Sequence, residues 1–276
     1  MSIEQVSADS GALSSVGLEF RRNRRAFPDV AEITLGGLPI AVLDRRETAR
    51  LIVDTAMARP LGRPAIFTSA NGEVISRVAS DRRIARLFAG ADLISADGQP
   101  LVFASRWLCG QPLPERVATT DLFHDAAHYA VRRGASFYLY GASEEENQRA
   151  FERVSLLYPG LRIVGRSSGY LQGDALVQRL AEINAAAPDV LWVGLGVPRE
   201  QLFCANYASA LPNVGAIKTS GGLFNFLSGT RRRAPEWMQR AGLEWSFRIL
   251  QEPGRLLWRY ASTNPHALFL LLTRSV

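Results

Sequence analysis

Residues 190–201 read VLWVGLGVPREQ, and this stretch decides the fold. Its first five residues form a short apolar run, which is typical of a strand buried on both faces of a sheet. The glycines at 194 and 196 allow a tight turn, and the polar residues after them are suited to begin a helix. A strand that turns directly into a helix is the repeating unit of parallel α/β sheets.

The same alternation extends over residues 31–228. Apolar runs that predict strands occur at 65–67, 91–94, 137–140, 161–164, 190–194 and 214–217. Stretches of helical length occur at 47–58, 121–133, 144–158 and 174–187. The predicted N-caps, whose oxygens can accept first-turn N–H groups, are Asp44, Asp121, Ser143 and Asp174. Right-handed crossovers between such strands predict an α/β domain, with a Rossmann-like, mostly parallel sheet covered by helices on both faces.

The two ends of the chain depart from this pattern. Residues 1–30 show no sustained periodicity and are expected to form a flexible lead-in. Residues 229–276 are rich in Trp, Leu and Arg, with Pro235, Pro253 and Pro265 as expected helix breakers. We predict two or three short amphipathic helices there, which would form a small C-terminal helical appendage.

Composition excludes several classes of protein. The 276 residues are 47% hydrophobic and 21% charged, which is globular rather than disordered composition. The longest apolar run is short, at 267–272, whereas a spanning helix needs about 20 residues, so no transmembrane segment is expected. No secretion signal is predicted, and Cys109 and Cys204 have neither disulfide-framework nor metal-binding spacing.

Positive charge is concentrated at the C-terminal end. The formal net charge is +6, and residues 229–276 hold eight arginines against three glutamates. Such clustering predicts an anionic partner, namely a phosphate group, a membrane surface or a nucleic acid. A solvated basic face is the alternative. No nucleic-acid-binding motif is recognised, so a nucleic acid is not the expected partner.

Candidate functional residues follow the predicted strands, because ligands of parallel sheets bind beyond the carboxyl ends of the strands. Asp97, before Gly98, can serve as a general base or cap the next helix. Ser69 and Asn71 follow another apolar run, where they can bind sugar hydroxyls or form a capping turn. Both interpretations stay open for each residue.

Two glycine turns and a set of arginines could bind phosphate. The turns at Gly196 and Gly222 can bring N–H groups to a phosphate at a helix N-terminus, or can be simple tight turns. Arg199 interrupts a G-x-G-x-x-G fingerprint, which argues against a nucleotide-dependent dehydrogenase. A single guanidinium group can bind two phosphate oxygens at once. The arginines that could do so here are residues 231–233, Arg248, Arg255 and Arg259.

One helical face resembles a metal site. It carries Asp121, His124, Asp125 and His128. No other segment supplies a further ligand, so an ordinary polar surface face is the favoured interpretation and no metal is predicted.

Taken together, the short motifs resemble one known family. They are Asp97-Gly98, Pro114-Glu115-Arg116-Val117 with Asp121-Leu122, Tyr138-Leu139-Tyr140-Gly141, Gly169-Tyr170, Gly194-x-Gly196-x-Pro198, Arg233-Ala234-Pro235-x-x-Met238, Gly242-Leu243-Glu244-Trp245, Glu252-Pro253-x-Arg255 and Arg259-Tyr260. In order and spacing, over about residues 35–265, they resemble the WecG/TagA/CpsF glycosyltransferases of bacterial surface-polysaccharide synthesis.

The resemblance implies an inverting, metal-independent transfer of a hexosyl group from a UDP-sugar to a saccharide on a polyprenyl diphosphate, without a cofactor. It implies that Asp97 is the catalytic base. The substrate-binding residues that it implies are Ser69, Asn71, Arg116, Gly196, Glu200, Gln201 and Gly222. The arginines that would close over the donor diphosphate are Arg248, Arg255 and Arg259.

Several residues depart from the family pattern. Ser69 replaces Thr, the Gln-Glu order is reversed at 200–201, and Ala118-Thr119 replaces Thr-Gly. Trp258 replaces Arg, and Asn225 replaces Asp. These changes concern the sugar pocket rather than the reaction class. They favour a glucosyl donor, with N-acetylmannosamine or its uronic acid as alternatives.

The basic C-terminal region is compatible with this chemistry. No Asp-x-Asp metal signature occurs, so arginines and helix N-termini would stabilise the departing diphosphate. Arginines interleaved with Trp and Leu predict docking of residues 229–276 on a membrane, at the inner, cytoplasmic face. The sequence leaves open a homo-oligomer. The alternatives in function are a non-catalytic nucleotide-sugar-binding protein and a nucleotide-dependent oxidoreductase.

Overall fold

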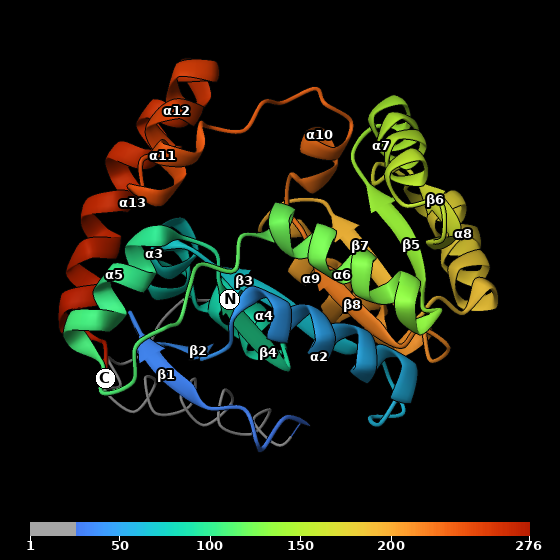
Figure 1. Ribbon diagram of the computed structural model, residues 1–276, viewed down its shortest axis with the longest axis horizontal. Helices are drawn as coiled ribbons and strands as arrows, with labels where there is room; N and C mark the ends of the chain where they lie inside the picture. Colours follow the sequence, from blue (N-terminus) through green and yellow to red (C-terminus); the bar gives the residue numbers. More distant parts are fainter. Residues whose placement is uncertain (1–25) are drawn as a thin grey trace, which may run out of the picture.

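The structure is a computed structural model that describes residues 26–276, apart from the side chain of Arg255 (Figure 1). Most of the expected lead-in at residues 1–30 therefore lies outside the described residues. The central sheet has six parallel strands in the order β4-β3-β8-β7-β5-β6. Their bounds are β3 (Ala65–Ala70), β4 (Leu93–Ala96), β5 (Ser136–Gly141), β6 (Arg162–Ser167), β7 (Val190–Gly194) and β8 (Ala216–Thr219). Each of the six apolar runs contributes one of these strands, so the parallel sheet is confirmed.

An antiparallel hairpin precedes the sheet and is absent from the sequence-based expectations. It consists of β1 (Glu32–Leu35) and β2 (Leu38–Ala41). The turn between them is Gly36-Gly37, with φ angles of +58° and +87°. Two central residues with positive φ match the twist of a two-residue hairpin, and glycine adopts this conformation without strain.

The helices lie where the periodicity predicts them, with small shifts at their starts. Those expected are α2 (Arg45–Ala58), α6 (Thr119–Arg133), α7 (Glu144–Leu157) and α8 (Gly173–Ala186). The others in this domain are α3 (Gly72–Ser80), α4 (Arg82–Ala89), α5 (Gln99–Leu108), α9 (Arg199–Tyr207) and α10 (Leu223–Leu227).

Two of the four predicted N-caps are confirmed. Asp44 and Ser143 form capping boxes, in which the side-chain oxygen accepts the N3 amide and the N3 glutamate binds back to the cap. The prediction is wrong for Asp121 and Asp174. Their helices begin two residues and one residue earlier, so both carboxylates lie inside the first helical turn. A carboxylate there is still stabilised by the positive end of the helix dipole.

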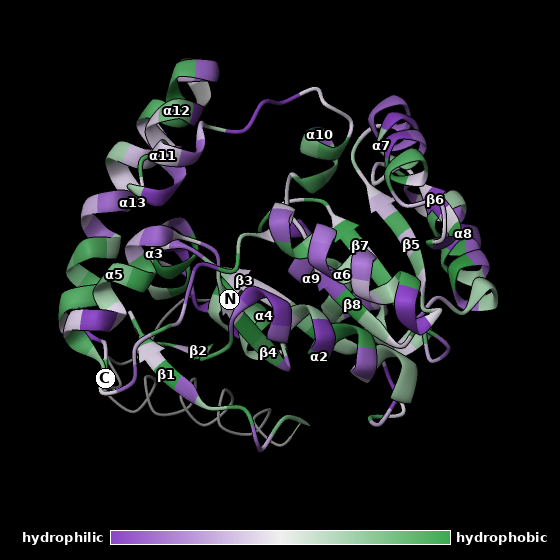
Figure 2. Cartoon of the chain, viewed as in Figure 1, coloured by the Kyte–Doolittle hydropathy of each residue, from purple (hydrophilic) through white to green (hydrophobic). Residues whose placement is uncertain are grey.

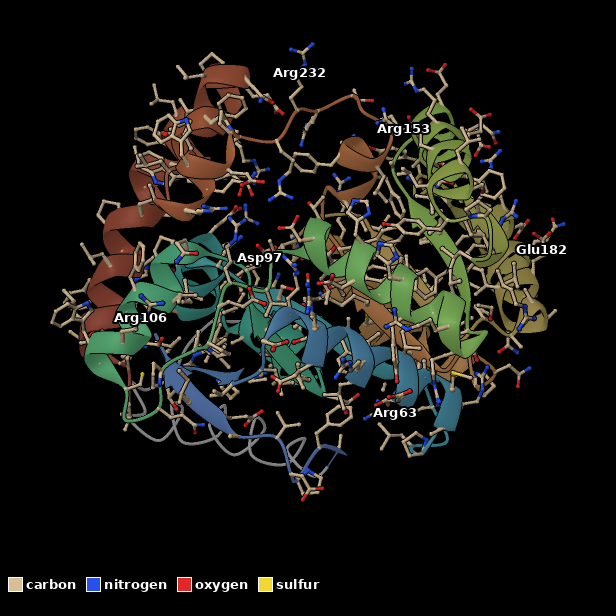
Figure 3. All side chains as sticks on the ribbon, in the orientation of Figure 1. Arg63, Asp97, Arg106, Arg153, Glu182 and Arg232 are labelled. Atoms are coloured by element: carbon tan, nitrogen blue, oxygen red, sulfur yellow. The ribbon has the colours of Figure 1, made fainter. Side chains whose placement is uncertain are left out.

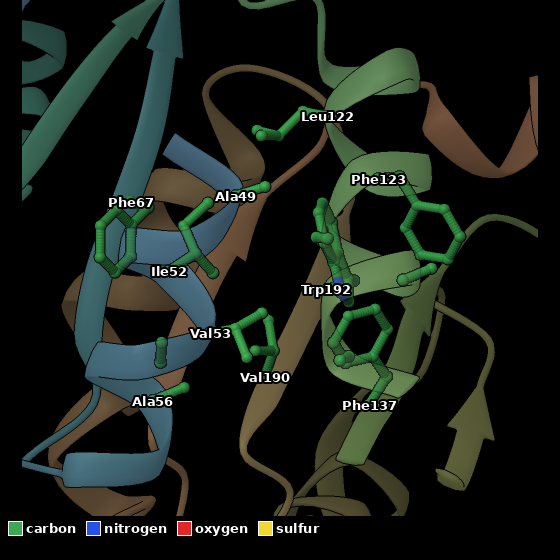
Figure 4. Packing of buried hydrophobic residues seen from close by; sticks show 14 of the residues in the cluster. Ala49, Ile52, Val53, Ala56, Phe67, Leu122, Phe123, Phe137, Val190 and Trp192 are labelled. Carbon is green, nitrogen blue, oxygen red and sulfur yellow. The ribbon is translucent and has the colours of Figure 1, made fainter. Parts of the chain in front are cut away.

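The sheet is covered on both faces because its strands are apolar on both sides. In β5, Phe137 and Leu139 pack with α2 and α6, whereas Tyr138 and Tyr140 pack with α8 and α9. Figure 4 shows the first of these layers, where Trp192 of β7 lies against aromatic neighbours. Its ring centroid is 4.9 Å from that of Phe123. The predicted layers are thus confirmed.

The C-terminal region consists of α11 (Glu236–Arg240), α12 (Glu244–Gln251) and α13 (Pro253–Thr273). The expected break at Pro265 is wrong, because α13 continues through it. Pro265 and Ala261, whose carbonyl loses its helical partner, are both exposed, so water can solvate that carbonyl. The other side of α13 packs on α3 and α5, and Figure 2 shows both apolar and polar residues along it.

The end of the chain pairs with the hairpin. Thr34 and Val276 exchange two backbone hydrogen bonds, of 3.1 and 2.9 Å, and the amide of Gly37 donates to the carbonyl of Arg274. Leu270 and Leu271 are buried in the same hydrophobic cluster as the hairpin. The last helix is therefore joined to the α/β domain by apolar packing and by backbone hydrogen bonds.

Candidate active site

The carboxyl ends of β3, β4, β7 and β8 meet at one edge of the sheet. Ser69 and Ser95 are register partners on β3 and β4, so the residues after these strands, Asn71 and Asp97, emerge beside each other. β8 pairs with both β3 and β7, which brings Gly222 and Gly196 to the same edge. Figure 3 shows Asp97 on the side of the sheet from which the C-terminal helices rise.

Asp97 is held in place by the start of α6. Its Oδ2 accepts hydrogen bonds from the backbone amide of Thr119, at 3.2 Å, and from the Thr119 hydroxyl, at 2.9 Å. The capping interpretation is wrong, because Gly98 is the N-cap of α5 and no side chain caps that helix. Asp97 is half-buried, and none of the described side chains or backbone groups forms a hydrogen bond with its Oδ1. One carboxylate oxygen is therefore fixed while the other is available to a substrate.

Ser69 binds a buried lysine. The ammonium group of Lys218 on β8 donates to Ser69 Oγ at 2.8 Å and to the carbonyl of Thr219 at 2.9 Å. Burial lowers the pKa of Lys218 to about 8, although Glu200 and Asp97 oppose this shift. Lys218 was missed as a site residue. The available signal was that the only lysine of the chain directly follows the apolar run 214–217.

Asn71 caps α3. Its Oδ1 accepts the amide of Val74 at 3.0 Å, so the capping interpretation is confirmed. The cap fixes the start of α3 next to Asp97, since a Cβ placed on Gly98 would lie 3.6 Å from the Asn71 Cβ. A role of Asn71 in substrate binding is compatible with this position.

Glu200 and Gln201 face the interior rather than an open cleft. Glu200 Oε2 accepts the amide of Gly221 at 2.8 Å, and Gln201 Nε2 donates to Thr68 Oγ1 at 3.2 Å. Both side chains are buried. Burial raises the pKa of Glu200, although the Gly221 amide and Lys218 oppose it. Glu200 thus connects the start of α9 to the turn after β8, and Gln201 connects it to β3, so the direct role of both side chains is to position the start of α9.

The two glycine turns differ in what surrounds them. Gly196 has a φ of +76°, and a Cβ placed there would meet no atom within 4 Å, so the turn borders open space. Gly222 precedes α10, which has only five residues, and it lies near the Arg231 guanidinium. A helix this short has a weak dipole, so an arginine is the stronger source of positive charge beside Gly222.

Two other positions require glycine, because a neighbouring part of the chain lies too close for a side chain. A Cβ on Gly141 would lie 2.3 Å from the carbonyl oxygen of Gly194, and Gly141 has a φ of +147°. A Cβ on Gly194 would lie 2.7 Å from the Phe224 ring. The ends of β5 and β7 can therefore approach this closely only because both positions are glycine. No side chain separates the two strand ends at this edge of the sheet.

An ion-pair network joins the C-terminal helices to this edge. Arg116 Nη1 contacts Glu244 Oε2 of α12 at 2.6 Å, and Arg233 Nη1 contacts Asp121 Oδ1 of α6 at 2.7 Å. Gln239 of α11 accepts from both arginines. Burial would raise the pKa of Asp121, but Arg233 and neighbouring arginines outweigh it and hold that pKa below its ordinary value.

The network borders a cavity of about 490 Å³. Residues from α5, α6, α11 and the segment before α6 line it, including Gln99, Arg116, Asp121, Gln239 and Arg240. Gln99 lies two residues after Asp97 in the chain, but Asp97 itself is not among the residues that line the cavity. A cavity of this size, with several convergent polar groups, is suited to a small polar ligand.

Side chains on the helical face that resembles a metal site bind other groups of the protein. Asp121 and Asp125 bind Arg45, and Asp121 also binds Arg233. His124 Nδ1 lies 2.7 Å from the hydroxyl of Tyr158. Within residues 26–276 no group of three or more His, Cys, Asp or Glu side chains is placed to hold a metal ion.

Of the three arginines expected over the donor diphosphate, Arg259 is bound at the edge of the site. Its Nη1 lies 3.3 Å from Glu73 in the first turn of α3. Arg248 is half-buried on α12 and forms no side-chain hydrogen bond or ion pair with the described residues. The side chain of Arg255 lies outside the described residues. Their role at the diphosphate remains a prediction.

Comparison with known proteins matches residues 33–276 to a family described as the glycosyl transferase WecG/TagA/CpsF family. A protein of Bacillus subtilis (strain 168), named N-acetylglucosaminyldiphosphoundecaprenol N-acetyl-beta-D-mannosaminyltransferase, is 33% identical over 75% of this chain and 79% of its own length. The protein of the same name from Bacillus spizizenii is 34% identical over 73% of this chain and 76% of its own length. The chain therefore belongs to the WecG/TagA/CpsF family, as its motifs predicted, and it is a glycosyltransferase.

Proposed function

We propose that this glycosyltransferase moves a hexosyl group from a UDP-sugar to a saccharide carried on a polyprenyl diphosphate, with inversion and with Asp97 as the general base. The observation that carries this proposal is the half-buried carboxylate of Asp97 at the carboxyl edge of the sheet. Thr119 holds its Oδ2, and Oδ1 has no partner within residues 26–276. The names of the two relatives support a polyprenyl-diphosphate acceptor.

The reaction is a single displacement. The acceptor hydroxyl oxygen attacks the anomeric carbon from the side opposite the UDP oxygen, so one C–O bond forms while the other breaks. The hydroxyl proton passes to Asp97, and the electrons of the broken bond leave with the diphosphate. A positioned general base contributes roughly 10²–10⁴-fold to such a step.

Positive charge from arginines would stabilise the departing diphosphate. Arg231 lies near the turn at Gly222, and Arg259 lies at the first turn of α3. Arg248, on α12, has a guanidinium group that no described residue binds. Guanidinium groups bind phosphate oxygens in pairs and stay charged when partly buried. We infer that these arginines converge on the donor when it binds.

The donor sugar follows from two opposing observations. The departures from the family pattern, among them Ser69 and the Glu200-Gln201 order, favour glucose. The names of both relatives favour N-acetylmannosamine. Because Glu200 and Gln201 are buried and bind the protein itself, their reversal is weaker support for a changed sugar pocket. N-Acetylmannosamine is therefore the first donor to test, and glucose the second.

Docking on a membrane is also part of the proposal. None of the helices within residues 26–276 combines the length and apolarity that crossing a bilayer requires. The C-terminal helices nevertheless expose large apolar side chains beside arginines. They are Trp237, Leu243, Trp245, Leu250, Leu257, Trp258, Leu268, Phe269 and Leu272. This combination is typical of a surface that inserts shallowly among anionic head groups.

The decisive experiment measures transfer and UDP binding separately. The purified full-length chain is incubated with labelled UDP-N-acetylmannosamine or UDP-glucose, an undecaprenyl-diphosphate-linked N-acetylglucosamine acceptor and EDTA. We expect Asp97→Asn to lower the transfer rate at least about 100-fold, while the Kd for UDP changes less than twofold.

A matched control is Asp174→Asn, since Asp174 is an exposed carboxylate on α8, outside the site. It should transfer at the wild-type rate. Comparable transfer by Asp97→Asn would remove Asp97 from the role of base. Stabilisation of the chain by NAD rather than by UDP would favour an oxidoreductase instead.

A further inference from the structure

Two hydroxyl groups connect the buried lysine to the candidate base. Lys218 Nζ lies 2.8 Å from Ser69 Oγ, and Ser69 Oγ lies 3.4 Å from Thr119 Oγ1. Thr119 Oγ1 lies 2.9 Å from Asp97 Oδ2. The four residues come from β8, β3, the start of α6 and the end of β4, so the fold assembles a continuous path from segments far apart in sequence.

The hydrogen bonds along this path have one direction. A charged ammonium group only donates, so Ser69 Oγ accepts from Lys218 and turns its own proton toward Thr119 or Ser95. A carboxylate only accepts, so the Thr119 hydroxyl donates to Asp97. Every hydroxyl proton can then point away from the lysine and toward the carboxylate, an arrangement in which successive bonds polarise one another.

We propose that Lys218 is a positioning residue for the transfer reaction, which holds the Asp97 carboxylate aligned through Ser69 and Thr119. This inference rests on the proposed role of Asp97 as the base. Lys218 itself is fully buried, so its ammonium group has no solvent-exposed side to offer a substrate. It acts by supplying positive charge at the far end of the path.

Other charged groups also face this centre. Glu200 and Cys204 on α9 and Asp97 all interact with Lys218. Burial raises the pKa of the Cys204 thiol to about 12, so that thiol stays neutral. Arg233 faces Asp97 from the C-terminal side and keeps its charge over the whole range of a pH profile. Among the charged groups of the described residues that face this centre, Lys218 is thus the cation that can lose its charge near neutral pH.

Removing the positive charge of Lys218 should reverse the direction of the hydrogen bonds along the path. An uncharged amine can accept a hydrogen bond from the Ser69 hydroxyl, so that Ser69 Oγ can in turn accept from Thr119, whose hydroxyl is then no longer directed toward Asp97. The charges of Lys218 and Asp97 also attract each other, so loss of the cation removes a favourable interaction with the negatively charged carboxylate. Both effects act on the base and leave UDP binding unchanged.

The test is the pH profile of kcat/KM, whose acid limb reports the ionisation of the base in the free enzyme. We expect Lys218→Met to lower kcat about tenfold and to move the acid limb upward, because the attraction between the cation and the carboxylate is lost. Wild-type activity should fall as Lys218 loses its proton near pH 8, and the two profiles should converge at alkaline pH. The Kd for UDP should change less than twofold.

Thr119→Val breaks the same path at its other end without disturbing the buried lysine. It should raise the acid limb as Lys218→Met does, and the double variant should show no further shift, because both changes interrupt one path. If Lys218→Met does not fold, Thr119→Val decides alone: a raised acid limb supports the proposal, and an unchanged one overturns it.

The failure of this inference is distinguishable from that of the proposed function. Transfer by the wild type, its loss in Asp97→Asn and unchanged acid limbs in Lys218→Met and Thr119→Val would overturn only the role of Lys218. No transfer by the wild type, or full transfer by Asp97→Asn, would overturn both. A purely structural lysine would lower stability without moving the acid limb.

Discussion

The sheet and the helices α11 and α12 are held by different forces. All residues of β5 and β7 are buried, whereas neither α11 nor α12 contains a buried residue. The two helices are joined to the rest of the chain by the charged side chains of Arg116, Asp121, Arg233 and Glu244. Apolar burial gives a rigid platform for Asp97, while ion pairs of partly exposed groups contribute less and are screened by salt.

Like the sheet, α13 is held in place by apolar burial. It buries Leu256, Ala267, Leu270 and Leu271, and His266 lies 2.9 Å from the hydroxyl of Ser76 on α3. The C-terminal region is thus anchored at its far end by apolar packing, and beside the cavity it is held mainly by ion pairs and by the hydrogen bonds of Gln239. A wall of this kind can open for substrate and close again without disturbing the core.

The largest effect on stability is expected in the core. Trp192→Ala removes a fully buried ring packed against Phe123 and Phe137. We expect the free energy of unfolding in urea to fall by about 3–5 kcal/mol, because a large cavity replaces the ring. Phe269→Ala, on the exposed side of α13, should change it by less than about 0.5 kcal/mol. A loss below about 1 kcal/mol for Trp192→Ala would contradict the assignment of stability to this layer.

A smaller and local effect is expected for the charged junction. Glu244→Gln weakens contacts to both Arg116 and Arg233, so we expect α11 and α12 to open about 1–3 kcal/mol more easily. Hydrogen exchange of the α11 and α12 amides should speed up, while that of β7 should not.

The matched control for this change is Glu236→Gln, which touches only the exposed Arg240 on the same helix. It should change exchange little, since exposed i,i+4 pairs contribute about 0.3–0.5 kcal/mol. Equal exchange in Glu244→Gln and Glu236→Gln would mean that the junction is held by something other than its ion pairs.

The same contrast explains what the sequence predicts well. The strands of the sheet are short apolar runs that need no distant partner to be recognised, and all six are predicted. Pro265 misleads because the effect of a proline depends on whether the freed carbonyl faces water, which only tertiary packing decides. The hairpin at 32–41 is missed because it pairs with itself and with the chain end rather than with the sheet.

In the candidate site, residues that directly follow a strand can be predicted from the sequence. Residues whose contacts depend on how two strands pair cannot. Ser69, Asn71 and Asp97 lie at or just after strand ends, where position alone indicates function. Lys218 lies within β8, and its contact with Ser69 depends on the pairing of β8 with β3. Thr119 reaches Asp97 only because α6 begins earlier than its periodicity predicts.

Acid should loosen the charged junction before the core. The pKa of Asp121 is lower in the folded chain than its ordinary value of 3.8, so its stabilising contribution is complete above about that pH and is lost as pH falls through the folded value. Protection of the α11 amides, corrected for the intrinsic exchange rate, should therefore fall as the pH drops below about 3.8, and by less than Glu244→Gln causes at pH 7. Asp121→Asn should remove this pH dependence, and its persistence in that variant would assign it to another carboxylate.

The smallest effect on the fold is expected at the exposed apolar residues, where the effect on a membrane should be largest. Leu257 on α13 and Leu157 on α7 are 59% and 60% exposed, so replacing either by Ser should change the free energy of unfolding by less than about 0.5 kcal/mol. Leu257 lies among the Trp and Arg side chains of the C-terminal helices, whereas Leu157 ends a helix on the opposite side of the molecule (Figure 1). Burying a leucine in lipid contributes about 1.5–3 kcal/mol, so Leu257→Ser should weaken binding to phosphatidylglycerol vesicles about tenfold or more, and Leu157→Ser should not. Equal vesicle binding by the two variants would mean that the exposed apolar side of α13 serves a different partner.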